Sequence, residues 1–216
     1  MSLLDLMAEL SKGMLKSVEI FTLTLIFSLP LGLFVAFGRM SKNPVIKNII
    51  KVYISIMRGT PLMLQLMVVY FGPLYIFKIP LSSAYRFQAV IIGFVFNYAA
   101  YFAEIYRGGI ESIAPGQYEA AKILGYNKSQ TFVRIIMPQV IKRIIPSITN
   151  EVITLIKDTS LAFVISVMEM FTMAKAFASA QKSMVPYLAA GVFYYVFNFL
   201  VASVMERIEK KLSYFQ

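Results

Sequence analysis

The feature that most constrains this chain is a series of long apolar runs, which lie at about 19–38, 59–77, 87–106, 144–168 and 186–205. A helix needs about 20 mostly apolar residues to cross a membrane, because lipid cannot hydrogen-bond to exposed backbone. Hydrophobic residues make up 58% of the chain and charged residues only 15%, which leaves too little polar surface for a water-soluble domain. We therefore expect an all-α integral membrane protein with five transmembrane helices, in one domain over residues 1–216.

The basic residues predict how these helices are oriented. Most of the 21 lysines and arginines lie between the first and second runs, between the third and fourth runs, or after the fifth. Basic residues are retained on the cytoplasmic side of a membrane. We therefore expect a multi-pass protein of the cell membrane, with the N-terminus outside and the C-terminus in the cytoplasm. Membrane topology accounts for the net charge of +10, so we expect no nucleic-acid partner.

The composition also argues against several kinds of chemistry. The chain has no cysteine and no histidine, so it has no disulfide framework, no thiolate or imidazole metal ligand, and no histidine general base. It contains no phosphate-binding loop of the form G-x-x-x-x-G-K-[ST], so it cannot hydrolyse ATP by itself. We expect no catalytic residue, no metal and no cofactor in this chain.

Two amphipathic segments lie between the expected spans. In segment 45–57, apolar residues recur at helical spacing, which predicts an interfacial helix that leads into the second span. Segment 168–184 is apolar but carries three charges, and we expect it to pack on the outer face. The Gly-Thr-Pro sequence at 59–61 predicts either a hinge or a helix start capped by the threonine.

The connection 107–143 is too long and too patterned to be a passive turn. A helix-forming run begins at 119–121 and is predicted to end at Gly125, a natural helix stop. A second amphipathic helix is predicted to begin within 127–129 and to stop at Pro138. Two short helices with a glycine bend suit docking into a groove of a partner; an ordinary cytoplasmic helical hairpin is the alternative.

The residues of this connection also form a recognisable pattern: Glu119, Ala120, Ala121, Gly125, Ile135, Met137 and Pro138. The pattern resembles the EAA loop of binding-protein-dependent ABC importer permeases, with Met137 in place of the usual leucine. Three further segments are similar to the polar amino acid permeases of that family, namely 58–62 together with Gln65, 103–110 and 157–161. The resemblance covers nearly the whole chain.

This resemblance implies a type I ABC importer permease. Two permease subunits, identical or sisters, would bind two ABC ATPase subunits that carry ATP and Mg, and an extracellular or periplasmic amino-acid-binding protein would deliver the amino acid. The EAA helix would be the cytoplasmic coupling helix, in a motif that extends to Pro138. Gly125 would supply the bend, Glu119 polar contacts, and Ala120 and Ala121 close approach to the ATPase.

Two of the expected spans carry polar stripes. In the fourth span the polar residues recur at spacings of four, three and four: Ser147, Glu151, Thr154 and Asp158. The third span carries a weaker stripe: Asn97, Tyr101 and Glu104. Ionisable residues within a membrane span are costly, and they indicate a functional site. If the two stripes face each other, they would line a water-accessible cavity rich in carboxylates.

Such a cavity favours a cationic amino acid, namely arginine, lysine or histidine. Glu151 and Asp158 would face its positive charge, and Asn97 would take its α-carboxylate. In the alternative, the charges only fix helix packing, for example Glu104 with Arg107, and the binding protein alone sets the specificity. Glutamine or another polar amino acid would then be the alternative cargo.

Two other classes of protein fit less well. A secondary transporter has no use for an EAA loop, and five spans without an obvious inverted repeat do not match its common plans. A membrane enzyme would need catalytic groups that this composition lacks.

Overall fold

The computed structural model describes residues 2–212, and within them it contains helices and connections but no β-strand. The all-α prediction is therefore confirmed for this range, while Met1 and residues 213–216 of the predicted domain lie outside the described residues. In chain order the helices are α1 (Leu3–Arg39), α2 (Pro44–Gly59), α3 (Leu62–Phe77), α4 (Ser83–Glu111), α5 (Pro115–Ile123), α6 (Lys128–Gln130), the π-helical segment η1 (Thr131–Ile136), α7 (Met137–Asp158), the 3₁₀ segment η2 (Thr159–Ile165), α8 (Met170–Gln181) and α9 (Val185–Leu212).

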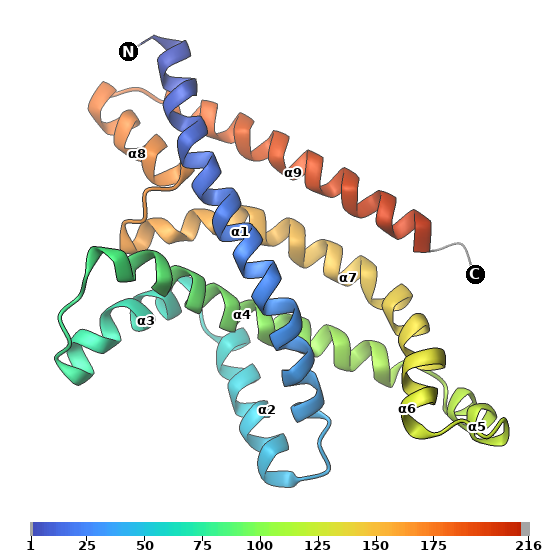
Figure 1. Ribbon diagram of the computed structural model, residues 1–216. Coiled ribbons are helices and arrows are strands. Elements are labelled where there is room, and N and C mark those ends of the chain that lie inside the picture. Colours follow the sequence, from blue (N-terminus) through green and yellow to red (C-terminus); the bar gives the residue numbers. More distant parts are fainter. Residues whose placement is uncertain (1, 213–216) are drawn as a thin grey trace.

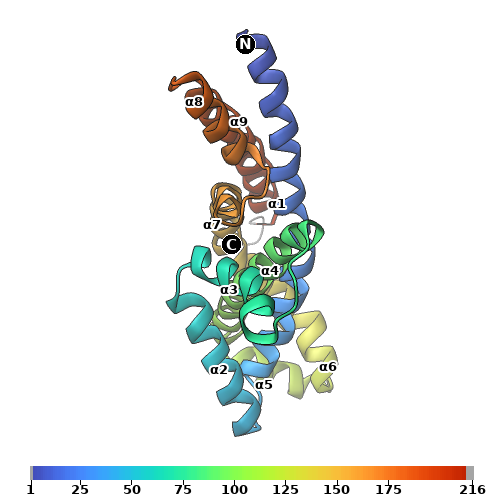
Figure 2. The same cartoon turned by 90° about the vertical axis from the view of Figure 1, so that its left-hand side faces the viewer.

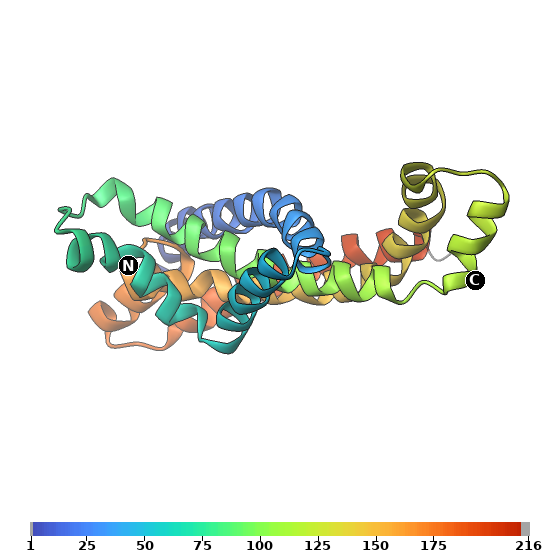
Figure 3. The same ribbon diagram turned by 90° about the horizontal axis from the view of Figure 1, so that it is seen from below.

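The helices pack around a central pair. Helix α1 crosses the molecule and packs most extensively against α4, which also contacts α3 and α7 (Figure 1). Helices α8 and α9 pack against each other beside the first half of α1, whereas α2 lies at the opposite end of α1 (Figure 2). Seen from below, α5 and α6 project from the bundle at the end of α4 (Figure 3). The candidate coupling elements therefore stand clear of the packed helices.

The number of spans lies between three and five. Among the described residues, three helices are long and apolar enough to cross a membrane by themselves, namely α1, α4 and α9. Two bent helix pairs raise the number to five if each pair forms one span: α2 with α3, bent by 111°, and segment Lys128–Ile165 with α8, bent by 58°. The predicted number of five is thus the upper end of what the helices allow.

The first expected span is part of a longer helix. Residues 19–38 lie within α1, which begins 16 residues earlier at Leu3. A capping box starts it: the Asp5 amide donates to the Ser2 hydroxyl, and the Ser2 amide donates to the Asp5 carboxylate, both at 3.1 Å. Near its other end, Gly32 lies against Phe102 of α4, where a Cβ would come within 2.8 Å of the Phe102 Cβ. Close packing of α1 on α4 therefore depends on this glycine.

The helix that carries the second expected span, 59–77, begins later than residue 59. Helix α3 begins only at Leu62, because Thr60 is extended and Pro61 has no amide to continue the helical ladder. The idea that the threonine caps α3 is wrong. The Thr60 hydroxyl donates back to the Ile56 carbonyl of α2 at 2.8 Å, and the start of α3 has no side-chain cap. The break at 59–61 is a sharp bend between two helices.

The fourth span, predicted at 144–168, and the preceding loop helix also differ from expectation. The loop helix does not stop at Pro138, so that prediction is wrong. Pro138 lies just after the π-helical segment η1, and the helical path continues from η1 through Pro138 into α7. At its far end α7 stops at Asp158 and tightens into η2, which ends at Ser166 in the left-handed conformation, φ 58°.

The main core lies where α1, α3, α4 and α7 meet. Its fully buried large side chains come from all four helices: Ile20, Leu66, Phe94, Tyr98, Phe102, Leu155 and Ile156. Many large apolar side chains remain on the outside, including Val68 of α3 and Phe199 of α9, which are 67% and 60% exposed. Such a surface is stable against lipid or another subunit rather than against water.

Candidate substrate site and coupling hairpin

The polar stripe predicted for the fourth span lies entirely on α7. Ser147 and Thr154 are exposed, and Glu151 and Asp158 are half-buried. The same helix turns a different set of side chains into the core: Val152, Leu155 and Ile156. Helix α7 thus presents its carboxylates beside the core and not within it.

A tyrosine from α4 meets this stripe at its end. The Tyr98 hydroxyl donates a 2.7 Å hydrogen bond to Oδ2 of Asp158, and Tyr98 itself is only 2% exposed. Glu151 lies close enough for its charge to act on both Tyr98 and Asp158. Neither Glu151 nor Asp158 forms an ion pair with any residue in the range 2–212. Two carboxylates therefore lie near a buried phenol at the contact between α4 and α7.

Arg58, the penultimate residue of α2, supplies a cation to the same region. Its guanidinium carbon lies 5.2 Å from the centroid of the Tyr101 ring, and its Nη1 lies 4.0 Å from Oε2 of Glu104. Its charge also acts on Glu151. The bend between α2 and α3 brings Arg58 to α4, so a residue that the sequence places between two spans comes close to the carboxylates.

The carboxylate of Glu104 is surrounded by arginine side chains. Arg107, one turn further along α4, donates from Nη2 at 2.6 Å and from Nε at 3.2 Å, and Nε of Arg39 on α1 lies 3.9 Å away. The Glu104–Arg107 pair of the structural alternative is thus present. Glu104 also lines a cavity of about 430 Å³ between α4 and α7, together with Arg143 and Ser147. Arg58 is the third arginine near Glu104. Because the three arginines come from α1, α2 and α4, Glu104 holds the ends of these helices together.

Asn97 is engaged elsewhere. It is 4% exposed, and its amide donates to the Met57 carbonyl at 3.1 Å and to Oε1 of Gln65 at 2.9 Å. The Gln65 amide in turn donates to the Met57 carbonyl at 3.0 Å and to the Thr60 hydroxyl at 2.8 Å. The bend interrupts the helix after Gly59 and leaves the Met57 carbonyl without a helical partner, and these side-chain amides supply the missing donors. Asn97 therefore stabilises the bend between α2 and α3.

The segment after α4 forms a helical hairpin, here called the coupling hairpin and defined as residues 115–136. Gly125 occupies its bend at φ +77°, a conformation that favours glycine. The Tyr126 amide closes the end of α5 by donating to the Ala121 carbonyl at 3.0 Å. Asn127 starts the second arm in a capping box with Gln130. The local sequence therefore determines this turn.

The coupling hairpin exposes apolar side chains. Ile123 is 86% exposed, Leu124 72% and Val133 61%, while Glu119 and Ala120 are also exposed. Such a surface is typical of a contact with another protein.

Contacts at its base attach the hairpin to α7. The Gln139 amide donates to Oε1 of Gln117 at 3.1 Å, and the Arg143 guanidinium donates to the backbone and to the hydroxyl of Ser112. Ala121 is fully buried inside the hairpin. The hairpin is thus joined to the helix that carries Glu151 and Asp158.

Residues 28–214 match the family model described as "Binding-protein-dependent transport system inner membrane component". The chain belongs to this family. Among its relatives, the probable amino-acid permease protein YxeN of Bacillus subtilis (strain 168) is 38% identical over 190 residues, which cover 88% of this chain and 84% of the relative. The L-cystine transport system permease protein TcyL of the same organism is 37% identical over 97% of this chain and 89% of its own length. The putative glutamine transport system permease protein GlnP of Rickettsia typhi (strain ATCC VR-144 / Wilmington) is 35% identical over 93% and 91%.

Solved structures agree with this assignment. A crystal structure of an amino acid ABC transporter with histidines matches with a TM-score of 0.85 and 30% identity, over 94% of both chains. The MetNI methionine ABC transporter matches with a TM-score of 0.73 at 15% identity, which shows the shared fold. The resemblance to polar amino acid permeases of ABC importers is therefore confirmed, and the chain is an inner-membrane component of such a system.

The permease also contains a buried carboxylate that sequence reasoning missed. Glu169 is fully buried at the start of α8, where it accepts from the amides of Phe171 and Thr172, both at 2.7 Å. It also accepts from the Tyr194 hydroxyl of α9 at 3.1 Å, and Ser17 of α1 lies 3.4 Å away. No residue within 2–212 forms an ion pair with it. Glu169 therefore connects α8 to α1 and α9 through hydrogen bonds. The sequence had predicted only that segment 168–184 packs on the outer face.

Two residues that sequence reasoning did not assign to the candidate site, Tyr98 and Arg58, lie near its carboxylates. The signal for Tyr98 was present, because a tyrosine inside a span needs a partner for its hydroxyl. Arg58 gave no such signal, since only the tertiary bend brings it to α4. Lys157, the neighbour of Asp158 in the sequence, has no ion pair within residues 2–212.

Proposed function

We propose that this permease imports a cationic amino acid, with the energy supplied by ATP hydrolysis in partner subunits. The observation that carries the proposal is the pair of carboxylates on α7, Glu151 and Asp158, which have no ion-pair partner in the described part of the chain. A carboxylate that is half-buried without a cation is costly, and a bound cation removes that cost.

The surrounding groups suggest how such a substrate binds. Asp158, oriented by Tyr98, and Glu151 take the positive charges of the amino acid. Arg58, whose guanidinium carbon lies 5.2 Å from the centroid of the Tyr101 ring, takes the α-carboxylate, the role that the sequence suggested for Asn97. Asn97 is buried against the bend, so its contribution is indirect. Ser147 and Thr154 complete the polar face of α7, while Glu104 positions Arg58.

A neutral polar amino acid is the second candidate, and Arg58 is the observation that favours it. The positive charge of Arg58 acts on Glu151 and offsets part of its negative charge. Asp158 then remains to bind the α-ammonium group that every amino acid carries. The relatives named for cystine and glutamine transport support this candidate. The related structure of an amino acid ABC transporter with histidines supports the first candidate, because histidine is one of its three expected cargoes.

The assembly that we propose follows the family. Two permease subunits, identical or sisters, face two ATPase subunits that bind ATP and Mg, and an amino-acid-binding protein docks on the opposite side. The exposed Ile123 and Leu124 of the coupling hairpin insert into the ATPase, with Glu119 and Ala120 beside them. The N-terminus is then outside, the C-terminus is cytoplasmic, and each bent helix pair contributes one span, in one permease domain.

Uptake into proteoliposomes tests the cargo. The complete transporter, purified with its ATPase and binding protein, is compared as wild type, Glu151→Gln and Asp158→Asn, with Glu19→Gln as a control on the exposed part of α1. We expect uptake of arginine and histidine to fall about tenfold or more, as for the loss of a charge contact, and glutamine uptake to fall less. Equal losses for all three amino acids would favour the neutral candidate, and no loss in any would refute a binding role.

A further inference from the structure

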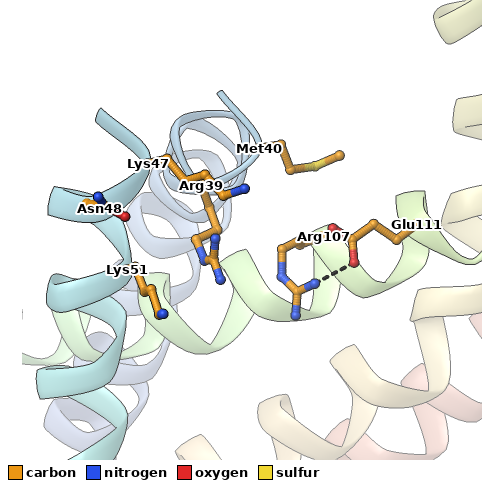
Figure 4. Close-up of a pocket in the computed structure, with 7 residues that line it drawn as sticks. All are labelled: Arg39, Met40, Lys47, Asn48, Lys51, Arg107 and Glu111. Carbon is orange, nitrogen blue, oxygen red and sulfur yellow. Dashed lines mark hydrogen bonds and ion pairs between the residues drawn. The ribbon is translucent and has the colours of Figure 1, made fainter. Parts of the chain in front are cut away.

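A second cavity of about 480 Å³ opens where the end of α1, helix α2 and the end of α4 meet. It shares Arg39 and Arg107 with the arginine cluster at Glu104, but Glu151 and Asp158 are not among its lining residues. Its polar lining consists of Arg39, Lys47, Asn48, Lys51, Arg107 and Glu111. Figure 4 shows Arg39, Lys51 and Arg107 pointing toward the same space from three different helices. Three elements that are distant in sequence therefore build one basic cavity.

The positive charge of this cavity is only partly neutralised. Arg107 pairs with Glu111 and Glu104, and Arg39 lies 3.9 Å from the same Glu104. Lys47 and Lys51 lie one turn apart on α2 and form no ion pair with any residue in the described range. Four cationic side chains thus face two carboxylates, and the two lysines are free to bind an anion.

The helix that carries these lysines is also apolar on its outside. A row of its large side chains is exposed: Val45, Ile46, Ile49, Val52 and Ile56. A helix with an exposed apolar face and flanking lysines lies in the boundary between lipid tails and water. Arg39 ends a long uncharged part of α1, which places the cavity at the same boundary. The abundant anions at that depth are the phosphate groups of phospholipids.

We propose that this cavity binds the headgroup of an anionic phospholipid. Its phosphate lies between Lys47, Lys51 and Arg39, and Asn48 hydrogen-bonds to a headgroup oxygen. The acyl chains run along the apolar face of α2. Basic pockets between transmembrane helices recognise such headgroups by charge and by their position at the membrane surface. The lipid joins α2 to α1 and α4, and it does so whichever amino acid the permease carries.

The decisive variant removes the two unpaired lysines, Lys47→Gln with Lys51→Gln. The matched control removes two distant lysines, Lys12→Gln with Lys182→Gln, with the same change in net charge. Each complete transporter is placed in nanodiscs of phosphatidylcholine with a minor fraction of phosphatidylglycerol, and the phosphatidylglycerol that remains bound after detergent exchange is counted by native mass spectrometry.

We expect the wild type and the control to retain phosphatidylglycerol and the cavity variant to bind it about 25-fold more weakly, since each lysine near a lipid surface contributes about fivefold. A Lys51→Arg variant, which keeps the charge, is expected to retain the lipid. Equal retention by the cavity and control variants would overturn the proposal.

Two further arms exclude other occupants. Inorganic phosphate and glycerol 3-phosphate, added to the detergent-solubilised complex, are expected not to displace the lipid; displacement at low concentration would overturn the proposal in favour of a soluble anion. An Ile49→Cys variant, cross-linked in membranes, is expected to give no dimer of permeases, and a dimer would show that a second copy covers this face and overturn the proposal. If the double variant does not assemble, Lys51→Gln alone is tested against Lys182→Gln, with the same expected difference in direction.

Discussion

The hydroxyl of Tyr98 lies 2.7 Å from Oδ2 of Asp158, and this bond joins the middle of α4 to the last residue of α7. Directly after Asp158 the chain changes from an α-helix to the tighter segment η2. The bond therefore fixes one of the proposed substrate-binding carboxylates at the point where the helix changes its geometry. Several measurements can separate its role in stability from its role in transport.

Replacement of Tyr98 by phenylalanine should destabilise the permease. The ring is buried, so the substitution keeps the packing and removes only the donor to a carboxylate, at a cost of about 1.5–3 kcal/mol. Thermal unfolding of the purified complex measures this change. Tyr195→Phe, at a side chain that is 71% exposed, is the control. An unchanged unfolding temperature for Tyr98→Phe would mean that the bond adds nothing to stability.

Glu169→Ala should destabilise the contact of α8 with α1 and α9. It leaves two amides at the start of α8 without an acceptor, and it also removes the partner of Tyr194, so we expect a loss of about 2–4 kcal/mol. Glu169→Gln keeps one acceptor oxygen and should lose less. Ser17→Ala should have the smallest effect, because both contacts of its hydroxyl with the start of α8 are long: 3.4 Å to the Glu169 carboxylate and 3.3 Å from the Met170 amide. Size-exclusion chromatography after graded heating ranks the three variants, and a different order would contradict this account.

Gly125→Ala should weaken coupling to the ATPase. An alanine at φ +77° is strained by about 1–2 kcal/mol, although no neighbouring atom would meet its Cβ. Gly116→Ala is a matched control in the same hairpin, since its Cβ would also meet open space and its φ is not positive. We expect lower substrate-stimulated ATPase activity for Gly125→Ala alone. Equal activity in the two variants would show that the bend tolerates the strain.

Arg58→Gln should raise the KM for uptake of every amino acid tested by about tenfold, because the α-carboxylate is common to all of them. Arg58→Lys should recover part of the loss, and Arg207→Gln, at an exposed position on α9, should have no effect. Concentration-dependent uptake into proteoliposomes gives these values. A selective effect on cationic substrates, or none at all, would exclude Arg58 as the carboxylate-binding group.

The helices of this permease could be predicted from the sequence wherever the signal was local. Uncharged apolar runs marked α1, α4 and α9, and Gly125 marked the bend of the coupling hairpin, because a left-handed backbone conformation favours glycine. The polar stripe of α7 was visible as well, since helical spacing alone places its members on one face. Each of these features depends on neighbours within a few turns of the same helix.

The features that were missed depend on contacts between helices. A proline such as Pro138 predicts the end of a helix from the sequence alone. In the structure the π-helical segment η1 precedes it and the helix continues into α7, which no local pattern indicates. Asn97 was assigned to the substrate, whereas Met57 and Gln65, more than 30 positions away, bind its amide. Arg58 reaches α4 through the 111° bend, an angle that no local pattern encodes.

Helix α7 has a mechanical consequence. Its 22 residues form about 33 Å of helix, with the base of the coupling hairpin at one end and Asp158 at the other. If the ATPase docks on the hairpin as proposed, a small tilt imposed there would shift Asp158, at the far end of α7, relative to Tyr98. Pro146, which interrupts the hydrogen-bond ladder, is where the helix flexes most easily. On the proposed assembly, release of the cargo would need only a tilt of α7 or a bend at Pro146, with no loss of its helical structure.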